Sequence, residues 1–268
     1  MSETNGPSEA MPDVQGYKDS RQLDITRVGI KAIRSPVIVR DKNAVQHSVA
    51  TFSMSVFLPQ DLKGTHMSRF TQLLNDFRQF EISATSVTEI QTEMLQRLES
   101  NAGTLKMEFP YFIDKKAPVS GQTGMLDYNI TLETNTHPDG STETRVKTDI
   151  PVTTLCPCSK EISEYGAHSQ RSVISINALL RENHNLHWED LIVSAEQQAS
   201  AQLYSQLKRA DEKFVTEQAY DNPRFVEDLI REVATVLNAN NNIQSYSLEV
   251  ENFESIHNHS AWAQILSQ

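Results

Sequence analysis

The sequence contains few cysteines, no long apolar run and no excess of basic residues. Cys156 and Cys158 are the only cysteines among 268 residues, which is too few for a disulfide framework and indicates free thiols in a reducing cytoplasm. No apolar stretch approaches the roughly 20 residues that span a bilayer, so no membrane segment is predicted. The start of the chain lacks the basic residues and apolar core of a secretory signal. The net charge of −11 argues against a nucleic-acid-binding surface.

Two glycine-rich nucleotide signatures are also absent. There is no G-x-x-x-x-G-K-[ST] P-loop, so a nucleoside triphosphate would not be held as in a motor or switch GTPase. There is no Rossmann glycine fingerprint either, which argues against a dinucleotide cofactor. Because the chain is acidic overall, a pocket for phosphate groups would have to concentrate Lys and Arg locally.

Hydrophobic periodicity predicts an α+β fold with antiparallel sheets, in which one order of elements occurs twice. The first half is expected to contain strands at 28–40 and 48–58, helices at 68–80 and 86–100, and strands at 105–112 and 125–133. The second half is expected to contain strands at 142–154 and 172–179, a helix over 188–207, a helix starting at Asn222-Pro223, and strands at 245–251 and 261–266. The order ββααββ therefore occurs twice. A capping box is predicted at Ser86–Glu89.

Composition and element order divide the chain into three regions. Residues 1–22 are rich in Ser, Glu, Gly, Pro and Asn and are predicted to form a disordered or loosely attached arm. Residues 23–137 would form the first ββααββ unit. Residues 138–268 would form the second unit, which carries most of the candidate site.

The residues that suggest chemistry lie in two segments about a hundred residues apart. The first runs from Leu155 through Cys156-Pro157-Cys158 to Arg171 and includes His168. The second is Glu251–His259, which contains two histidines. Thiolate, imidazole and carboxylate groups together are ligands of a borderline-soft divalent metal. We therefore expect one site that folding assembles from both segments.

A different use of the same side chains is open at this stage. Cys156, Cys158, His257 and His259 could form a closed Cys₂His₂ structural zinc site. That hypothesis leaves His168 and the acidic residues without a role.

These segments resemble the type IB GTP cyclohydrolases. The matching motifs are Cys-Pro-Cys-Ser-Lys-Glu-Ile-Ser, Gly-Ala-His-x-Gln-Arg and Glu-Asn-Phe-Glu-Ser-Ile-His-Asn-His-Ser, together with the stretches 63–70, 117–121 and 208–213. The resemblance extends from about Val28 to Ala263. It implies a tandem tunnelling fold whose two units close into barrels when subunits associate, and a homotetramer with sites near subunit interfaces.

The resemblance also implies a role for each candidate residue. The metal ligands would be Cys156, His168, Glu212 and His257. The groups that take part in catalysis would be Cys156, His168, Glu227, His257 and His259. Glu254 would accept hydrogen bonds from the N–H edge of the purine. The triphosphate would be bound by Arg171, Lys208 and Arg209, together with Lys63 and Arg69 of the first half, in the same or another subunit.

The reaction implied is the first step of folate and pterin biosynthesis. GTP and water would become 7,8-dihydroneopterin triphosphate and formate, without a redox cofactor. A divalent ion would activate water for attack at C8 of the guanine ring. Cys158 is followed by Ser-Lys-Glu and not by the Cys-x-x-His pattern of type IA enzymes, so Mn²⁺, Fe²⁺ and Zn²⁺ all stay possible.

Two other functions are compatible with such a scaffold. One is the nitrile reductase of queuosine synthesis, which uses a nucleophilic cysteine and NADPH; its Glu-Ser-Lys-Ser type signature is absent here. The other is a protein that binds a pterin or purine without turnover. Metal content would separate both from a cyclohydrolase.

Overall fold

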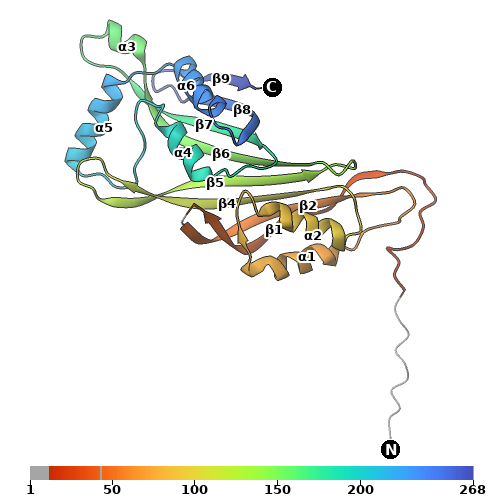
Figure 1. Cartoon of the computed structure of the whole chain (residues 1–268). Helices are drawn as coiled ribbons and strands as arrows, with labels where there is room; N and C mark the ends of the chain where they lie inside the picture. The colour runs from red at the N-terminus through yellow and green to blue at the C-terminus, as the bar shows by residue number, and fades with distance from the viewer. Residues whose placement is uncertain (1–11, 43, 268) are drawn as a thin grey trace, which may run out of the picture.

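The protein folds around one continuous sheet (Figure 1). The computed structural model describes residues 12–42 and 44–267. Within them, the strands are ordered β3-β1-β2-β4-β5-β6-β7-β8-β9. All neighbouring strands are antiparallel except β1 and β3, which are parallel. The α+β class with a large sheet is therefore confirmed.

The strands and helices follow the predicted order closely. The first half contains β1 (Ile25–Asp41), β2 (Ala44–Leu58), α1 (Met67–Asp76), the 3-10 turn η1 (Phe77–Gln79), β3 (Glu81–Ile82), α2 (Val87–Arg97), β4 (Gly103–Lys116) and β5 (Thr123–Thr136). The second half contains β6 (Thr142–Leu155), α3 (Pro157–Ile162), β7 (Ser169–Leu180), α4 (Trp188–Glu196), α5 (Arg209–Asp221), α6 (Val226–Asn238), β8 (Ile243–Asn252) and β9 (Ala261–Leu266).

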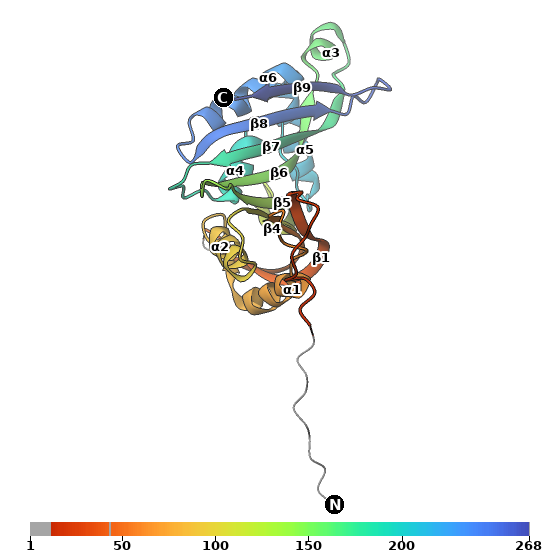
Figure 2. The ribbon, with the colours of Figure 1, turned by 90° about the vertical axis from the view of Figure 1, so that its right-hand side faces the viewer.

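Alternating side chains give the sheet one apolar and one polar face. In β2, Phe52, Met54 and Val56 are buried while the residues between them are half-exposed. Helices α1, α2, α4 and α6 cover the apolar face, and their apolar side chains form one core cluster with those of the strands (Figures 1 and 2). That cluster includes residues from both halves of the chain.

Helix α4 is shorter than predicted. The apolar spacing suggested a helix to Leu207, but α4 ends at Glu196. Ala201 instead exchanges two backbone hydrogen bonds with Thr153 of β6, at 3.0 and 3.2 Å. Pairing with the sheet therefore overrides the local helical pattern here.

Helix α5 was not predicted at all. In it only Asp211 and Ala219 are buried, so the sequence lacks the apolar stripe by which such a helix is detected. The cysteine segment forms the short helix α3, with Pro157 in its first turn.

Helix α6 begins later than predicted, and the capping box predicted at the start of α2 is absent although α2 begins where expected. Helix α6 begins at Val226, after Pro223, and the backbone N–H of Phe225 donates to Asp228 Oδ2 at 3.0 Å. Helix α2 has no capping box at Ser86. The Ser86 hydroxyl instead accepts from the N–H of Ser83 at 2.9 Å, so it stabilises the turn that precedes the helix.

Part of the predicted arm pairs with the segment that follows β2. Residues 1–11 fall outside the described residues. Farther on, the N–H of Asp19 donates to Asp61 O and the N–H of Lys63 donates to Tyr17 O, both at 2.9 Å. Within the described ranges no helix combines the length and apolarity that crossing a membrane requires.

Candidate active site

Cys156 and His168 meet at the end of the β6–β7 hairpin. Strand β6 ends at Leu155, which pairs with Ser169 at the start of β7. Helix α3 occupies the connection, so Cys156 and His168 flank it. The N–H of Cys156 donates to His168 O at 3.1 Å. Local strand pairing therefore places these two predicted residues side by side.

Ser159 holds the two together. Its backbone N–H lies 3.5 Å from Cys156 Sγ, within reach of a hydrogen bond to sulfur. Its hydroxyl donates to Cys156 O at 3.1 Å and accepts from the N–H of His168 at 3.2 Å. Ser159 therefore fixes the backbone of Cys156 and of His168 relative to each other.

The imidazole of His168 is surrounded by oxygen atoms. Its Nδ1 lies 2.9 Å from Gln170 Oε1, 3.5 Å from Ser255 Oγ and 3.9 Å from Glu254 Oε2. The side chains of His168 and Glu254 are only 13% and 15% exposed. Glu254 reaches this position because β8 pairs with β7, and the N–H of Phe253 donates to Arg171 O at 3.0 Å.

Sequence reasoning missed Gln170, Ser159 and Ser255 as neighbours of the site. All three lie inside the motifs that carry the family resemblance, so the motifs themselves were the available signal. Gln170 is buried, which is unusual for a polar side chain without a structural or functional partner.

The other cysteine and histidines are more exposed. Cys158 is exposed on α3. His257 and His259 lie in the turn between β8 and β9, and their rings stack with centroids 5.0 Å apart. The two imidazoles therefore lie side by side in an exposed turn.

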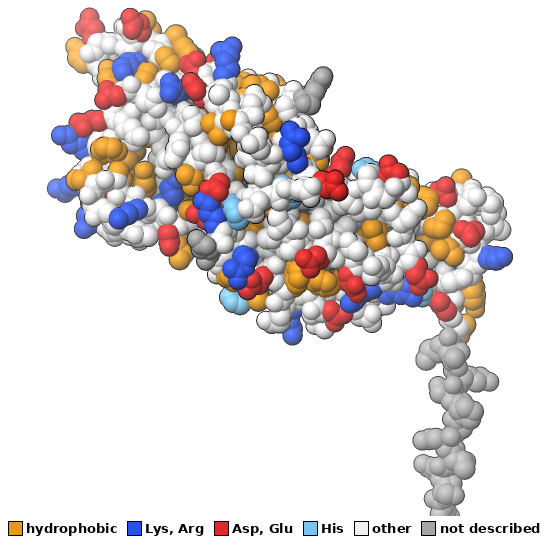
Figure 3. Space-filling model, viewed as in Figure 1, with side chains coloured by type: hydrophobic (Ala, Val, Ile, Leu, Met, Phe, Trp, Pro, Cys, Tyr) orange, Lys and Arg blue, Asp and Glu red, His pale blue; other side chains and the backbone are white. Residues whose placement is uncertain are grey.

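The acidic candidates Glu212 and Glu227 are both exposed, one in the first turn of α5 and the other in the first turn of α6. Lys208 precedes α5 and Arg209 begins it. Figure 3 shows Lys and Arg side chains gathered over α5 and the neighbouring β4–β5 turn. The exposed basic residues there are Lys116, Lys208, Arg209 and Lys213. The acidic chain thus has a local basic surface at the start of α5, beside the β4–β5 turn, while α3 contacts the other end of α5 through Lys160 and Tyr220 O.

The basic candidates of the first half lie elsewhere in the chain. Arg69 Nη1 donates to Arg97 O at 2.6 Å and pairs with Glu99 at 2.9 Å. Lys63 lies over the Tyr17 ring, 5.7 Å from its centroid. Both belong to the α1 region, at the opposite end of the molecule from α3 in both ribbon views (Figures 1 and 2).

The donor atoms at Cys156 and His168 suit a divalent metal in kind, since one offers a sulfur and the other an imidazole nitrogen. In residues 12–42 and 44–267 no three His, Cys, Asp or Glu side chains gather closely enough to hold a metal ion. The structure therefore brings two of the predicted ligands together and does not add Glu212 or His257 to them. Nor do Cys156, Cys158, His257 and His259, all within the described residues, gather into the hypothetical Cys₂His₂ site.

Comparisons with known proteins match almost the whole chain. Residues 11–263 match the family model described as type I GTP cyclohydrolase folE2. The curated "GTP cyclohydrolase FolE2" of Azoarcus sp. (strain BH72) is 54% identical over 97% of each chain. That of Thiobacillus denitrificans is 52% identical over 99% of this chain and 97% of its own.

A solved structure supports the fold independently. Uricase from Arthrobacter globiformis superposes with a TM-score of 0.53, covering 90% of this chain and 93% of its own, at 7% sequence identity. At that identity the likeness concerns the fold alone, and it places this chain with the tunnelling-fold proteins.

Proposed function

This chain belongs to the type I GTP cyclohydrolase FolE2 family and is a GTP cyclohydrolase of folate and pterin biosynthesis, and we propose that Cys156 and His168 form the centre of its active site. Identity above 50% over the full chain to proteins named for this activity decides against the nitrile reductase and the non-catalytic binder. The observation that carries the proposed site is the Cys156–Ser159–His168 cluster at the end of the β6–β7 hairpin.

We assign the metal ligands to Cys156, His168, Glu212 and His257. A divalent ion held there (Mn²⁺, Fe²⁺ or Zn²⁺) would supply Lewis-acid activation of water. The proposal is supported by the proximity of Cys156 and His168, which offer a sulfur and an imidazole nitrogen, and by the exposure of Glu212 and His257. Glu212 and His257 complete the set only if they move towards Cys156 or come from another copy of the chain.

The remaining side chains would bind GTP and move protons. Glu254 would accept hydrogen bonds from the guanine N–H edge, and its half-buried position beside His168 supports this role. The basic surface at Lys208 and Arg209, with exposed Arg171, would bind the triphosphate. We assign proton transfer to the ring nitrogens during opening to Glu227, His257 and His259.

We propose that the active protein is a homotetramer in which 23–137 and 138–268 are two tunnelling-fold units that close into barrels with other copies. The open edge strand β9 and the uncovered polar face of the sheet favour such closure. Lys63 and Arg69 lie far from Cys156 within one chain, so they would reach a site only in a neighbouring subunit. The free thiols fit a cytoplasmic location.

The test uses matched cysteine variants. The full-length protein is stripped with a chelator, single metals are restored anaerobically, GTP is added, and oxidised samples are read for neopterin fluorescence. Cys156→Ala should lose bound metal and at least about 100-fold of the activity, because removing a ligand should cost more than removing a supporting residue. Cys158→Ala, two residues away and exposed, is the control and should keep both.

The outcome that contradicts the site is clear. If Cys156→Ala folds normally and retains metal-dependent turnover equal to that of Cys158→Ala, the centre of the site lies elsewhere. Metal stoichiometry, measured by elemental analysis on the same samples, separates loss of metal from loss of chemistry.

A further inference from the structure

Beneath His168 a row of polar side chains interrupts the apolar face of the sheet. Thr154, Gln170 and Ser172 are all buried, and they lie among Val152, Ile174 and Val250. Buried polar groups cost free energy unless they are hydrogen-bonded. These three are bonded in sequence: Gln170 Nε2 donates to Thr154 Oγ1 at 2.9 Å, and Thr154 Oγ1 lies 2.8 Å from Ser172 Oγ.

The row ends at the imidazole of His168. With the Gln170 amide nitrogen directed at Thr154, its carbonyl oxygen Oε1 faces His168 Nδ1 at 2.9 Å. That distance is a full hydrogen bond, whereas Ser255 Oγ at 3.5 Å is at the limit and Glu254 Oε2 at 3.9 Å is beyond it. Gln170 is therefore the principal partner of this ring nitrogen.

The surrounding groups determine which ring nitrogen carries the proton. An ionised carboxylate only accepts hydrogen bonds, and the Glu254 carboxyl group lies 3.9 Å from Nδ1, beyond Gln170 and Ser255. A lone pair at Nδ1 would face both the Gln170 carbonyl and this carboxylate, which is unfavourable. A proton at Nδ1 donates to the Gln170 carbonyl and is attracted by the nearby carboxylate, and it leaves the lone pair on Nε2.

We propose that Gln170 is a positioning residue that holds His168 in the Nδ1–H tautomer, so that Nε2 is the nitrogen available for metal binding. A ligating histidine generally donates its other ring N–H to a neighbouring group, which fixes both its tautomer and its ring orientation. Here the neighbour is a neutral amide, itself anchored by Thr154 and Ser172 in the core. This proposal rests on the proposed function, because it names the residue that orients His168, one of the proposed metal ligands.

The test measures the tautomer directly in the metal-free protein. Histidine labelled with ¹⁵N in both ring positions is incorporated into the full-length chain, and the His168 signals are assigned by their loss in His168→Gln. Spectra are recorded at about pH 8, above the ordinary histidine pKa of about 6.5, so that the ring is neutral. The wild-type protein should show a protonated Nδ1 and an unprotonated Nε2.

Two substitutions at one position separate positioning from packing. Gln170→Leu removes the acceptor at similar size and should shift His168 towards the Nε2–H tautomer. It should also weaken binding of added Zn²⁺ or Mn²⁺ by about 10–100-fold. Gln170→Glu keeps an acceptor oxygen and should retain the Nδ1–H tautomer and most of the metal affinity. Ser255→Ala, which removes the more distant neighbour, should leave the tautomer unchanged.

The proposal is overturned if Gln170→Leu, shown by circular dichroism to be folded, keeps a protonated Nδ1, or if the wild-type protein has its proton on Nε2. Equal loss of metal affinity in the leucine and glutamate variants would also contradict it, since that would indicate packing alone. Because the tautomer is read without metal or GTP, these outcomes are independent of whether the proposed metal site proves correct.

Discussion

At the scale of single residues, Asp211 ties α5 to the β4–β5 turn. Its Oδ1 accepts from the N–H groups of Val119 and Ser120, each at 2.8 Å, and its Oδ2 accepts from the N–H of Lys208 at 2.9 Å. The adjacent residue Glu212 is a proposed metal ligand. One buried carboxylate thus joins two of the motifs that carry the family resemblance.

This carboxylate should make stability depend on pH. Burial alone would raise the pKa of Asp211, but hydrogen bonds from Ser120, Lys208 and Val119 outweigh it and hold the pKa well below its ordinary value. A lowered folded-state pKa contributes stability that is complete above the ordinary pKa of about 3.9 and is lost as the pH falls through the folded value. Asp211→Asn should therefore lower the urea midpoint at pH 7, and the difference from wild type should shrink below about pH 4.

The control is Asp61→Asn, at an exposed carboxylate. It should change the midpoint little at either pH. A difference between Asp211→Asn and wild type that stays constant down to about pH 3 would show that the carboxylate charge is not what stabilises this contact.

The proximity of Cys156 and His168 could be predicted from sequence, because the two residues bound the connection between two consecutive strands. Gln170 could not be assigned a role, since a glutamine two residues after a histidine says nothing about where its amide points. Only the buried row from Thr154 to Ser172 shows that it turns towards the ring.

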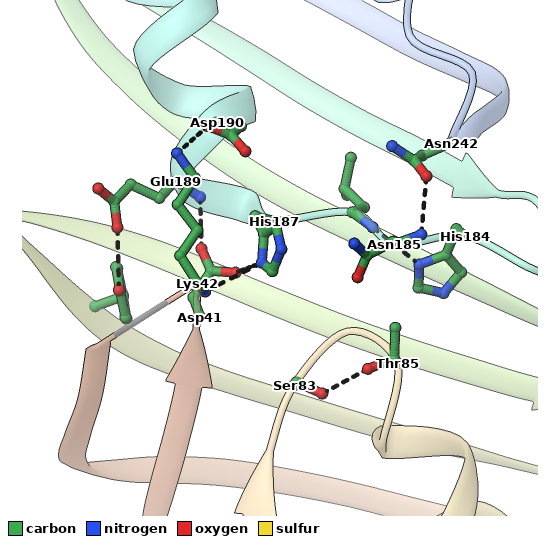
Figure 4. A network of polar contacts seen from close by, with 12 residues as sticks. Asp41, Lys42, Ser83, Thr85, His184, Asn185, His187, Glu189, Asp190 and Asn242 are labelled. Carbon is green, nitrogen blue, oxygen red and sulfur yellow. Dashed lines mark hydrogen bonds and ion pairs between the residues drawn. The ribbon is translucent and has the colours of Figure 1, made fainter.

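At the scale of secondary-structure elements, α4 is capped by a residue from another element. Its N-cap, His187, makes no side-chain capping bond. The carboxylate of Asp41, at the end of β1, instead accepts from the N–H of Glu189 at 2.8 Å and lies 2.8 Å from His187 Nδ1 (Figure 4). Burial, only partly offset by these bonds, raises the pKa of Asp41. A carboxylate at a helix N-terminus is stabilised by the helix dipole.

Removing this cap should cost more than removing a comparable surface contact. Asp41→Ala should lower the free energy of unfolding by about 1–3 kcal/mol, because it leaves the part-buried N–H of Glu189 without its acceptor. Asp139→Ala is the matched control: Asp139 also accepts from one backbone N–H, that of Ser141 at 2.9 Å, but in an exposed turn. Urea unfolding measures both, and equal costs would contradict the capping role of Asp41.

The helices and strands that were predicted well are those whose own residues show the hydrophobic periodicity of the element. The strands alternate, and α6 presents Leu229, Val233 and Leu237 to the core. The end of α4 could not be predicted, because Ala201 pairs with a strand almost fifty residues earlier in the chain. The exposed helix α5 has little apolar pattern to predict from.

At the scale of the whole molecule, the two halves of the chain share one sheet and one core, and α4 joins them. Trp188 packs edge-on against Phe109 and Tyr111 of β4, with centroids 5.7 and 5.5 Å apart. At the other end of α4, Glu196 is completely buried and forms an ion pair with Lys115 of β4. The Tyr128 hydroxyl donates to the same carboxylate, and its burial beside Glu196 raises the pKa of Tyr128.

Sequence could name the candidate residues of the first half but not their distance from the others. Lys63 and Arg69 match family motifs as well as Lys208 does. They belong to the α1 region, however, which lies at the opposite end of the molecule from α3. Whether such residues share a site depends on how copies of the chain associate, which no pattern within one chain records.

The buried pair offers a test of how tightly the halves are joined. Lys115→Met should lower the free energy of unfolding by about 3–5 kcal/mol, because the Glu196 charge is left buried with only the Tyr128 hydroxyl as partner. Adding Glu196→Gln should restore part of that loss, since the amide is neutral and its oxygen still accepts from Tyr128.

On the surface, Lys213→Met removes the i,i+4 pair with Glu217, 3.8 Å apart, and should cost less than about 1 kcal/mol. Urea unfolding followed by Trp fluorescence measures all three, and a double variant no more stable than Lys115→Met would show that the penalty comes from lost packing and not from the unpaired charge.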